Sequence, residues 1–342
     1  MKITWLLGSF ICASALLQAA PQSPKNASQE APAYDADLFK RDVSVVSFHG
    51  SFLYWRVQEG ALDYAIKMQQ APSAGETYAS GKFHTATFNG DPGFRVAMSY
   101  FRAPKYWEVW GQYTRLTARG KNGVGRPEDP SRFLNGTWPQ PTDSPISKAE
   151  SHIHMNYNVA DLLVDRFFNP NPHLRLRLIG GATAAWINQN WQIRYMNLQN
   201  QVSLNTNKWK FVGGGLRLGA MLDWFWGYNV YVTATATCGS LLGTYHNTSR
   251  LTSSTAAGAL RDTHYSDVRP AITVQGSFGP SWQKNFAWSR MEIFAGYELN
   301  TWFNLQEMYR STLSSATSSK QTFLNTGMVA LQGLTARATV DF

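Results

Sequence analysis

Cysteine is almost absent from this chain of 342 residues, which contains only Cys12 and Cys238. Cys12 lies in an N-terminal segment that we expect to be removed, and this leaves Cys238 without a partner in the same chain. A fold held together by disulfides is therefore excluded. We expect Cys238 to be a free, buried thiol, and the alternative is a link to a second chain.

Charge is also scarce, at 15% of residues, although the formal net charge is +9. The basic residues are scattered and mostly alternate with apolar residues. A surface that binds nucleic acid would gather them into a patch or stripe. This distribution predicts that nucleic acid is not a partner.

Helical signals are missing as well. No amphipathic helical pattern is sustained over three turns, and a mean hydropathy of −0.30 is too polar for a helical membrane protein. Residues 224–249 contain no Asp, Glu, Lys or Arg, which could indicate a membrane-spanning helix. Within them, however, "YNVYVTATATCGS" (228–240) alternates Val and Ala with Thr, and this alternation favours a β-strand.

Three regions differ in composition. Residues 1–20 carry one charge, Lys2, and an apolar run, which predicts a secretory signal peptide. Residues 21–42 are rich in Pro, Ala and polar residues, and we expect a flexible lead-in. Residues 43–342 show no linker, so we expect one domain.

About thirteen segments of this domain alternate apolar and polar residues over roughly 10–16 positions, with turn signals between them. Strands of soluble proteins usually have about 5–6 residues, whereas a tilted strand needs about 9–11 to cross a bilayer. Three stretches read as long loops: 119–149, 244–265 and 311–322. Aromatic residues gather near segment ends, as in the two interfacial girdles of a membrane barrel. They are Tyr54/Trp55, Tyr106/Trp107, Trp186, Trp224/Trp226 and Trp302/Phe303.

The final residues "LQGLTARATVDF" alternate strictly and stop at an aromatic side chain. A barrel closes by pairing its last strand with its first, so we expect this strand to form the seam. Ala338, Val340 and Phe342 also match the C-terminal signal that the bacterial barrel-assembly machinery reads.

These features predict an all-β fold, a transmembrane antiparallel β-barrel of 12–16 strands with long extracellular loops, in the bacterial outer membrane. The alternative is a soluble β-sandwich or adhesin domain. That alternative would have shorter strands, and its aromatic residues would lie in a central core.

The segments "GSFLYWRVQEGALDYA" (50–65), "FVGGGLRLG" (211–219) and "LQGLTARATVDF" (331–342) resemble the Legionella-type pore-forming outer membrane proteins, a family that includes porins of environmental chlamydiae similar to the major outer membrane protein. The resemblance extends over about 45–342. It implies a porin-like barrel with no catalytic residues. The chlamydial major outer membrane proteins proper are rich in cysteine and cross-linked, and the single Cys238 departs from that pattern.

If the apolar strand face meets lipid, the polar face lines a lumen. Alternation then assigns eight candidate pore-lining residues, namely Arg95, Arg175, Arg177, Arg217, Arg290, Glu292, Glu298 and Arg337. More arginine than carboxylate would attract anions, so one hypothesis is a preference for anions. The alternative is that these arginines pair with Glu108, Glu292, Glu298 and Asp341 across strands and stabilise the barrel.

No cofactor or metal is expected. His152 and His154 share one strand face, but they supply two ligands without an evident third, and we interpret them as polar lumen residues. No spacing singles out a nucleophile with a base, so we do not expect an enzyme.

The sequence therefore predicts an outer-membrane porin for passive diffusion of small hydrophilic solutes. The alternative is a barrel with a plugged lumen that serves as scaffold for a surface adhesin. The expected partners are outer-membrane lipid, the barrel-assembly machinery and the solutes. The sequence leaves open whether the chain forms a homo-oligomer.

Overall fold

The structure, a computed structural model, describes residues 43–68, 81–102, 105–139, 146–311, 321–324 and 327–342. The expected signal peptide and lead-in lie outside them, as does most of the expected loop 311–322. The regular elements in the described residues are all β-strands, which confirms the all-β fold. A helix long and apolar enough to span a membrane does not occur in these ranges.

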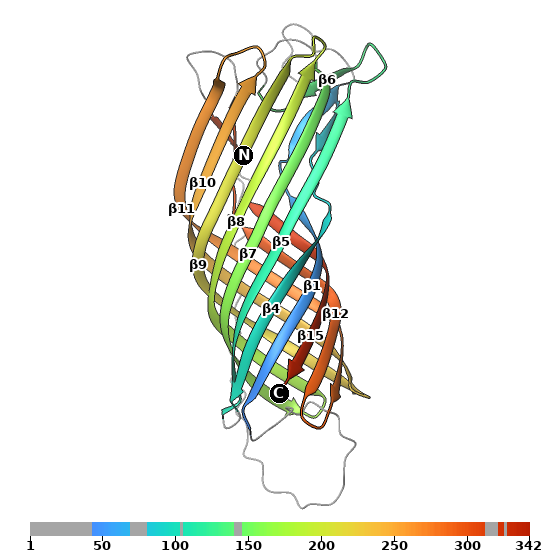
Figure 1. The fold of residues 1–342 in the computed structure, drawn as a ribbon, viewed down its shortest axis with the longest axis vertical. Helices are drawn as coiled ribbons and strands as arrows, with labels where there is room; N and C mark the ends of the chain where they lie inside the picture. Colours follow the sequence, from blue (N-terminus) through green and yellow to red (C-terminus); the bar gives the residue numbers. More distant parts are fainter. Residues whose placement is uncertain (1–42, 69–80, 103–104, 140–145, 312–320, 325–326) are drawn as a thin grey trace, which may run out of the picture. The chain divides into compact units, whose positions relative to one another are not determined.

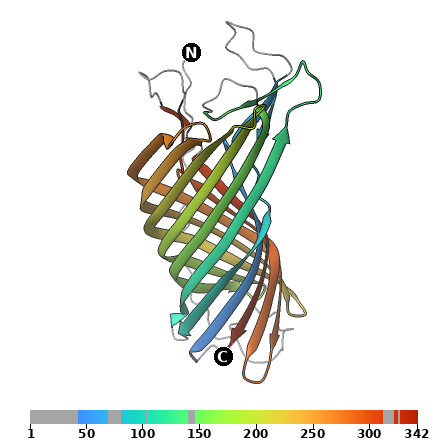
Figure 2. The same cartoon turned by 45° about the horizontal axis from the view of Figure 1, so that its top comes forward.

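Ten strands of the described chain close into an antiparallel barrel (Figure 1). In ring order they are β1 (Val45–Glu59), β15 (Met328–Asp341), β12 (Arg290–Phe303), β11 (Ala259–Asn285), β10 (Val230–Ser253), β9 (Val202–Gly227), β8 (Leu174–Asn197), β7 (Ile146–Asn171), β5 (Trp107–Gly125) and β4 (Gly90–Arg102). The strands run obliquely around the ring (Figure 2). The expected transmembrane barrel architecture is confirmed.

The seam joins the first and last strands, as predicted. In β1 and β15, Ser47 lies opposite Asp341 and Glu59 lies opposite Val329. Val46 and Phe342 exchange backbone hydrogen bonds of 3.2 and 2.9 Å. The sheet is therefore closed without a free edge, as a membrane barrel requires.

The predicted strand number of 12–16 is wrong, because two kinds of segment were counted incorrectly. Residues 173–188 and 191–197 looked like separate strands but form one, β8. Segments 62–68 and 77–88 looked like wall strands, but residues 63–68 and 81–85 belong to a small sheet that is separate from the ring. That sheet consists of β2 (Asp63–Met68), β3 (Gly81–Thr85) and β6 (Phe133–Gly136), and β13 (Met308–Ser311) and β14 (Gln321–Leu324) form a separate hairpin.

One expected loop is largely strand, and a second contains strand residues. The stretch 244–265 belongs to β10 and β11 except for the turn between Ser253 and Ala259, and β5 continues to Gly125 within 119–149. Polar composition did not end these strands, because their outer face is polar here while their inner side chains remain partly or fully buried.

The two ends of the barrel differ. Short connections follow β7, β9 and β11 at the end that also holds the seam's Val46 and Phe342, which we call the turn end. The β9–β10 turn has Tyr228 and Asn229 at φ 53° and 64°, and two adjacent positive φ angles are typical of a tight two-residue hairpin. The opposite end, which we call the loop end, carries the longer connections, including the small sheet.

Strands β7 to β11 contain 24–27 residues each, more than twice the roughly 9–11 that a bilayer requires. Along β8 the outward positions Leu174, Leu176 and Leu178 are apolar, but Asn188, Asn190 and Gln192 are polar. The inward positions change in the opposite sense, from Arg175 and Arg177 to Ile187, Trp191 and Ile193. The half near the turn end therefore suits lipid outside, and the half near the loop end suits water outside.

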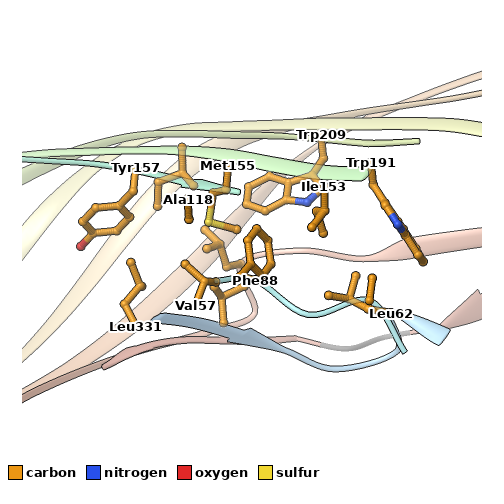
Figure 3. Close-up of a cluster of buried hydrophobic side chains, with 14 of the residues drawn as sticks. Val57, Leu62, Phe88, Ala118, Ile153, Met155, Tyr157, Trp191, Trp209 and Leu331 are labelled. Atoms are coloured by element: carbon orange, nitrogen blue, oxygen red, sulfur yellow. The ribbon is translucent and has the colours of Figure 1, made fainter. Parts of the chain in front are cut away.

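A hydrophobic cluster occupies the interior of the loop half. Figure 3 shows side chains from β1 and β15, such as Val57 and Leu331, pointing toward side chains of β7 to β9, such as Met155 and Trp209. The small sheet contributes Tyr64, whose backbone oxygen accepts a 2.5 Å hydrogen bond from the Tyr195 hydroxyl. We call this group the apolar cluster.

Candidate functional site: a charged belt inside the barrel

All eight candidate pore-lining residues line one cavity in the turn half of the barrel. They come from strands β4, β8, β9, β12 and β15, which surround the lumen. Their positions follow from alternation, because residues two apart on a strand share a face. The cavity volume is about 120 Å³, which has room for on the order of ten water molecules, since one water needs on the order of 10–15 Å³ by this measure.

Each of the six arginines meets a carboxylate. Arg95 and Glu298 form two parallel bonds of 3.1 and 2.7 Å, the fork geometry that makes arginine pairs strong. The remaining pairs are Arg175 Nε–Asp223 Oδ2 at 2.9 Å, Arg177 Nη2–Asp223 Oδ2 at 3.2 Å, Arg217 Nη1–Asp161 Oδ2 at 3.3 Å, Arg290 Nε–Asp341 Oδ2 at 2.6 Å and Arg337 Nη2–Glu292 Oε1 at 2.9 Å.

The balance of charge differs from the sequence estimate. Facing inward with the six arginines are seven carboxylates: Glu108, Asp161, Asp165, Asp223, Glu292, Glu298 and Asp341. We call these thirteen residues the charged belt. The pairing predicted as the alternative to anion attraction is present for Glu292, Glu298 and Asp341, so excess positive charge does not characterise this lumen.

Sequence reasoning missed Asp161, Asp165 and Asp223. Asp223 is fully buried between Arg175 and Arg177 and also accepts a 2.8 Å hydrogen bond from the Thr233 hydroxyl. Its signal in the sequence was a lone carboxylate in the apolar run "GAMLDWFW", six positions from Arg217 and therefore on the same strand face.

Aromatic side chains close the charged belt on the side of the loop end. Trp55 is fully buried and donates its Nε1–H to the Thr335 hydroxyl at 3.1 Å. The Cζ atom of Arg95 lies over its ring, 5.5 Å from the ring centroid. Trp302 is also fully buried, and its ring centroid is 6.1 Å from that of Tyr157. We call Trp55, Tyr157 and Trp302 the aromatic layer.

This layer corrects the prediction of interfacial girdles in two places. Trp55 and Trp302 point inward, whereas their neighbours Tyr54 and Phe303 point outward and are exposed. Consecutive residues of a strand face opposite sides, so each aromatic pair places only one ring toward lipid. The other proposed girdle residues, Tyr106, Trp107, Trp186, Trp224 and Trp226, are exposed on the outside.

Two further assignments change, those of the two histidines and of Cys238. His152 and His154 lie on the outer face of β7, because the inward positions there are Ile153 and Met155, so these histidines do not line the lumen. Cys238 is free, as expected, but it is exposed on the outer face of β10 and not buried. Phe342 is exposed, and its ring lies 6.4 Å from that of Phe48.

The part of the chain that the structure describes contains no assembled metal site. Groups of three or more His, Cys, Asp or Glu arranged to hold a metal ion do not occur among those residues. The chemistry that the charged belt itself offers is electrostatic: paired charges and a small polar cavity.

Comparison with known proteins identifies the family. The family described as Legionella pneumophila major outer membrane protein precursor matches residues 43–338. Because this match covers most of the chain, the protein belongs to that family, and it is a protein of the bacterial outer membrane. No curated protein matches the chain.

Several solved structures are similar in outline. The outer membrane protease OmpT of Escherichia coli covers 90% of this chain and 99% of its own, at 8% identity and a TM-score of 0.41. A FadL homologue of Pseudomonas aeruginosa covers 88% and 90%, at 6% identity and a TM-score of 0.26. The toluene transporter TodX of P. putida covers 89% and 90%, at 8% identity and a TM-score of 0.22. At these TM-scores the function of this chain does not follow from theirs.

Proposed function

We propose that this protein is a narrow porin through which ions and small hydrophilic solutes pass passively along the charged belt. The observation that supports this most strongly is the concentration of ionisable residues inside the membrane-embedded half of the barrel. Buried ion pairs often contribute little net stability compared with apolar residues of the same volume. Ionisable groups at membrane depth therefore indicate a pathway for solute or ions.

The pore we propose is narrow. The cavity among the charged residues is small, and the aromatic layer and the apolar cluster lie between it and the loop end. Water and ions cross an apolar constriction only when it is wetted, so such residues can gate a channel. We therefore expect small single-channel currents and exclusion of larger sugars.

Ion selectivity should be weak. Paired charges cancel one another's field at a distance, and six arginines face seven carboxylates. The earlier hypothesis of anion preference thus loses its main support. We also propose that the protein turns over no substrate and uses no cofactor, because transport of this kind needs only a wetted lumen.

Planar bilayer recording tests the proposal. The mature chain is refolded, inserted into a planar bilayer, and recorded with a salt gradient across the membrane. We expect discrete, small conductance steps and a reversal potential close to zero. A reversal potential far from zero would contradict a lumen with balanced charge. Absence of conductance from a correctly folded barrel would reject the pore.

A second candidate function is a plugged barrel that supports an adhesive surface. The apolar cluster favours it, because a core that includes fully buried Trp191 and Phe211 fills the loop half as in a soluble protein. The same recordings separate the two candidates, since a plugged scaffold would insert and remain silent.

A further inference from the structure

A band of basic side chains encircles part of the barrel's outer face near the loop end. It consists of Arg115, Arg119 and Lys121 on β5, Lys208 and Lys210 on β9, and Arg250 on β10, and all six are exposed. We call these residues the cationic band. Side-chain ion pairs are absent for all six among the residues that the structure describes. Surface charges of one sign that lack partners are available to a ligand.

Strand register places these residues close together. Arg119 lies opposite His154, His154 opposite Asn190, and Asn190 opposite Lys208, so one row across four strands has a cation at each end. Adjacent strands are about 4.8 Å apart, so the row spans roughly 14 Å. Lys208 and Lys210 follow each other on the same face of β9, roughly 7 Å apart, which allows both flexible side chains to reach one phosphate group.

The cationic band directly borders the exposed apolar side chains on the outer face of the turn half, which we call the apolar belt. On β9 the outward residues Leu218 and Leu216 are 66% and 68% exposed, Val212 follows, and the next outward position is Lys210. On β5, Tyr113 is followed on the same face by Arg115. Groups at this height meet lipid headgroups whenever the apolar belt is in the membrane, and long basic side chains reach toward that level.

Carboxylates are few on the same surface. Above the apolar belt, the outer face of the described strands β5 and β7 to β10 carries one, Glu150, which already pairs with Lys148 at 2.6 Å and Arg194 at 3.8 Å. At the two margins of the band, Asp262 on β11 lies opposite Arg250, and Asp91 on β4 accepts a 2.7 Å hydrogen bond from the backbone N–H of Arg119, so Lys208 and Lys210 are the members farthest from a carboxylate. The surface therefore complements a negative ligand. In outer-membrane barrels the longer loops face the cell exterior, so the band lies at the headgroups of the outer leaflet.

We propose that the cationic band is a binding site for the phosphate groups of a phosphorylated glycolipid in the outer leaflet. Lys208 and Lys210 form its centre, and Arg119 binds a second phosphate along the same row. The hydrocarbon chains of the lipid would pack against the apolar belt below. This site lies outside the lumen, so it does not depend on whether the barrel conducts.

Lipid titration of matched variants tests the proposal. The refolded full-length mature barrel in detergent is titrated with bis-phosphorylated lipid A and with the same lipid after removal of its phosphates. The test variant is Lys208→Gln/Lys210→Gln. The control is Arg102→Gln/Lys284→Gln, which removes the same charge from exposed outer positions at the turn end.

We expect the test variant to bind the phosphorylated lipid about 30-fold more weakly, because each basic residue near a charged surface contributes about a fivefold factor. The control should bind like the unaltered protein, and the dephosphorylated lipid should bind weakly to all three. Equal affinity for both lipids, or equal loss in both variants, would overturn the proposal.

Competition with inorganic phosphate distinguishes a lipid site from a site for any free anion. If it displaces the lipid at equal concentration, the site recognises a free anion and the assignment to a lipid is wrong. Heat-modifiable migration in gels checks folding of every variant, and the single variants Lys208→Gln and Lys210→Gln replace the double variant if it does not fold.

Discussion

At the scale of single residues, Asp223 is the most constrained member of the charged belt. It is fully buried, and its Oδ2 is 2.9 Å from Arg175 Nε and 3.2 Å from Arg177 Nη2. Two cations therefore depend on one carboxylate. A buried pair that loses one partner leaves an uncompensated charge, and this penalty exceeds the net benefit that the intact pair gives.

Asp223→Ala should consequently lower the free energy of unfolding by about 3–5 kcal/mol. Urea titration of the refolded barrel, followed by tryptophan fluorescence, measures this change. The matched control is Asp129→Ala, which breaks the exposed pair of Asp129 with Arg132 at 3.4 Å and should lower the stability far less, because exposed ion pairs contribute little. Equal costs for the two variants would show that the Asp223 pair is hydrated and not buried.

The arginines of the charged belt could be predicted from alternation alone, since each strand pattern fixes which side chains share a face. Their partners could not. Arg95 and Glu298 are 203 residues apart and meet across the seam strands β1 and β15, and local patterns do not say which inward side chains face each other across the ring. The sequence therefore predicted the inward arginines of the site but not the carboxylates that balance their charge.

At the scale of the strand, the main feature is the exchange of polarity between the two faces. From the sequence alone, the apolar face of every segment is expected to be the lipid face. That is right for Val230 and Val232 on β10, but Ile153 and Met155 on β7 are apolar and point inward. Alternation has the same period in both cases, so it reveals a strand without saying which side is inside.

The length of β8 makes the exchange testable with one type of substitution. Ala182 is exposed amid the apolar belt, opposite Leu162 and Leu216, whereas Gln192 is exposed ten residues farther along the same face. Ala182→Arg should destabilise the barrel in lipid vesicles by about 2–4 kcal/mol, the cost of arginine on the lipid face near the midplane.

Gln192→Arg is the matched control, because it adds the same side chain to the same strand in a region that we expect to be in water. It should change the unfolding free energy by no more than about 1 kcal/mol. Unfolding in vesicles measures both. A similar large cost at position 192 would place the membrane across the loop half and contradict the assignment of the two halves.

At the scale of the whole molecule, ten strands enclose a lumen that side chains largely fill. The charged belt occupies the turn half and the apolar cluster the loop half, with the aromatic layer between them. Strand number was predicted too high because the long strand β8 looked like two strands, and because segments of the small sheet looked like wall strands. In the pore that we propose, passage depends on whether the aromatic layer opens.

Single-channel conductance of the unaltered protein beside Trp302→Ala tests this account most directly. Trp302 is buried against Tyr157, so removal of its ring should enlarge the conductance at the cost of about 3–5 kcal/mol of stability. Trp302→Leu provides a milder variant if folding fails, and Trp226→Ala, on the exposed outer face, should leave the conductance unchanged. Larger currents in Trp302→Ala alone are the predicted result. Identical currents in all variants would contradict a lumen closed by the aromatic layer.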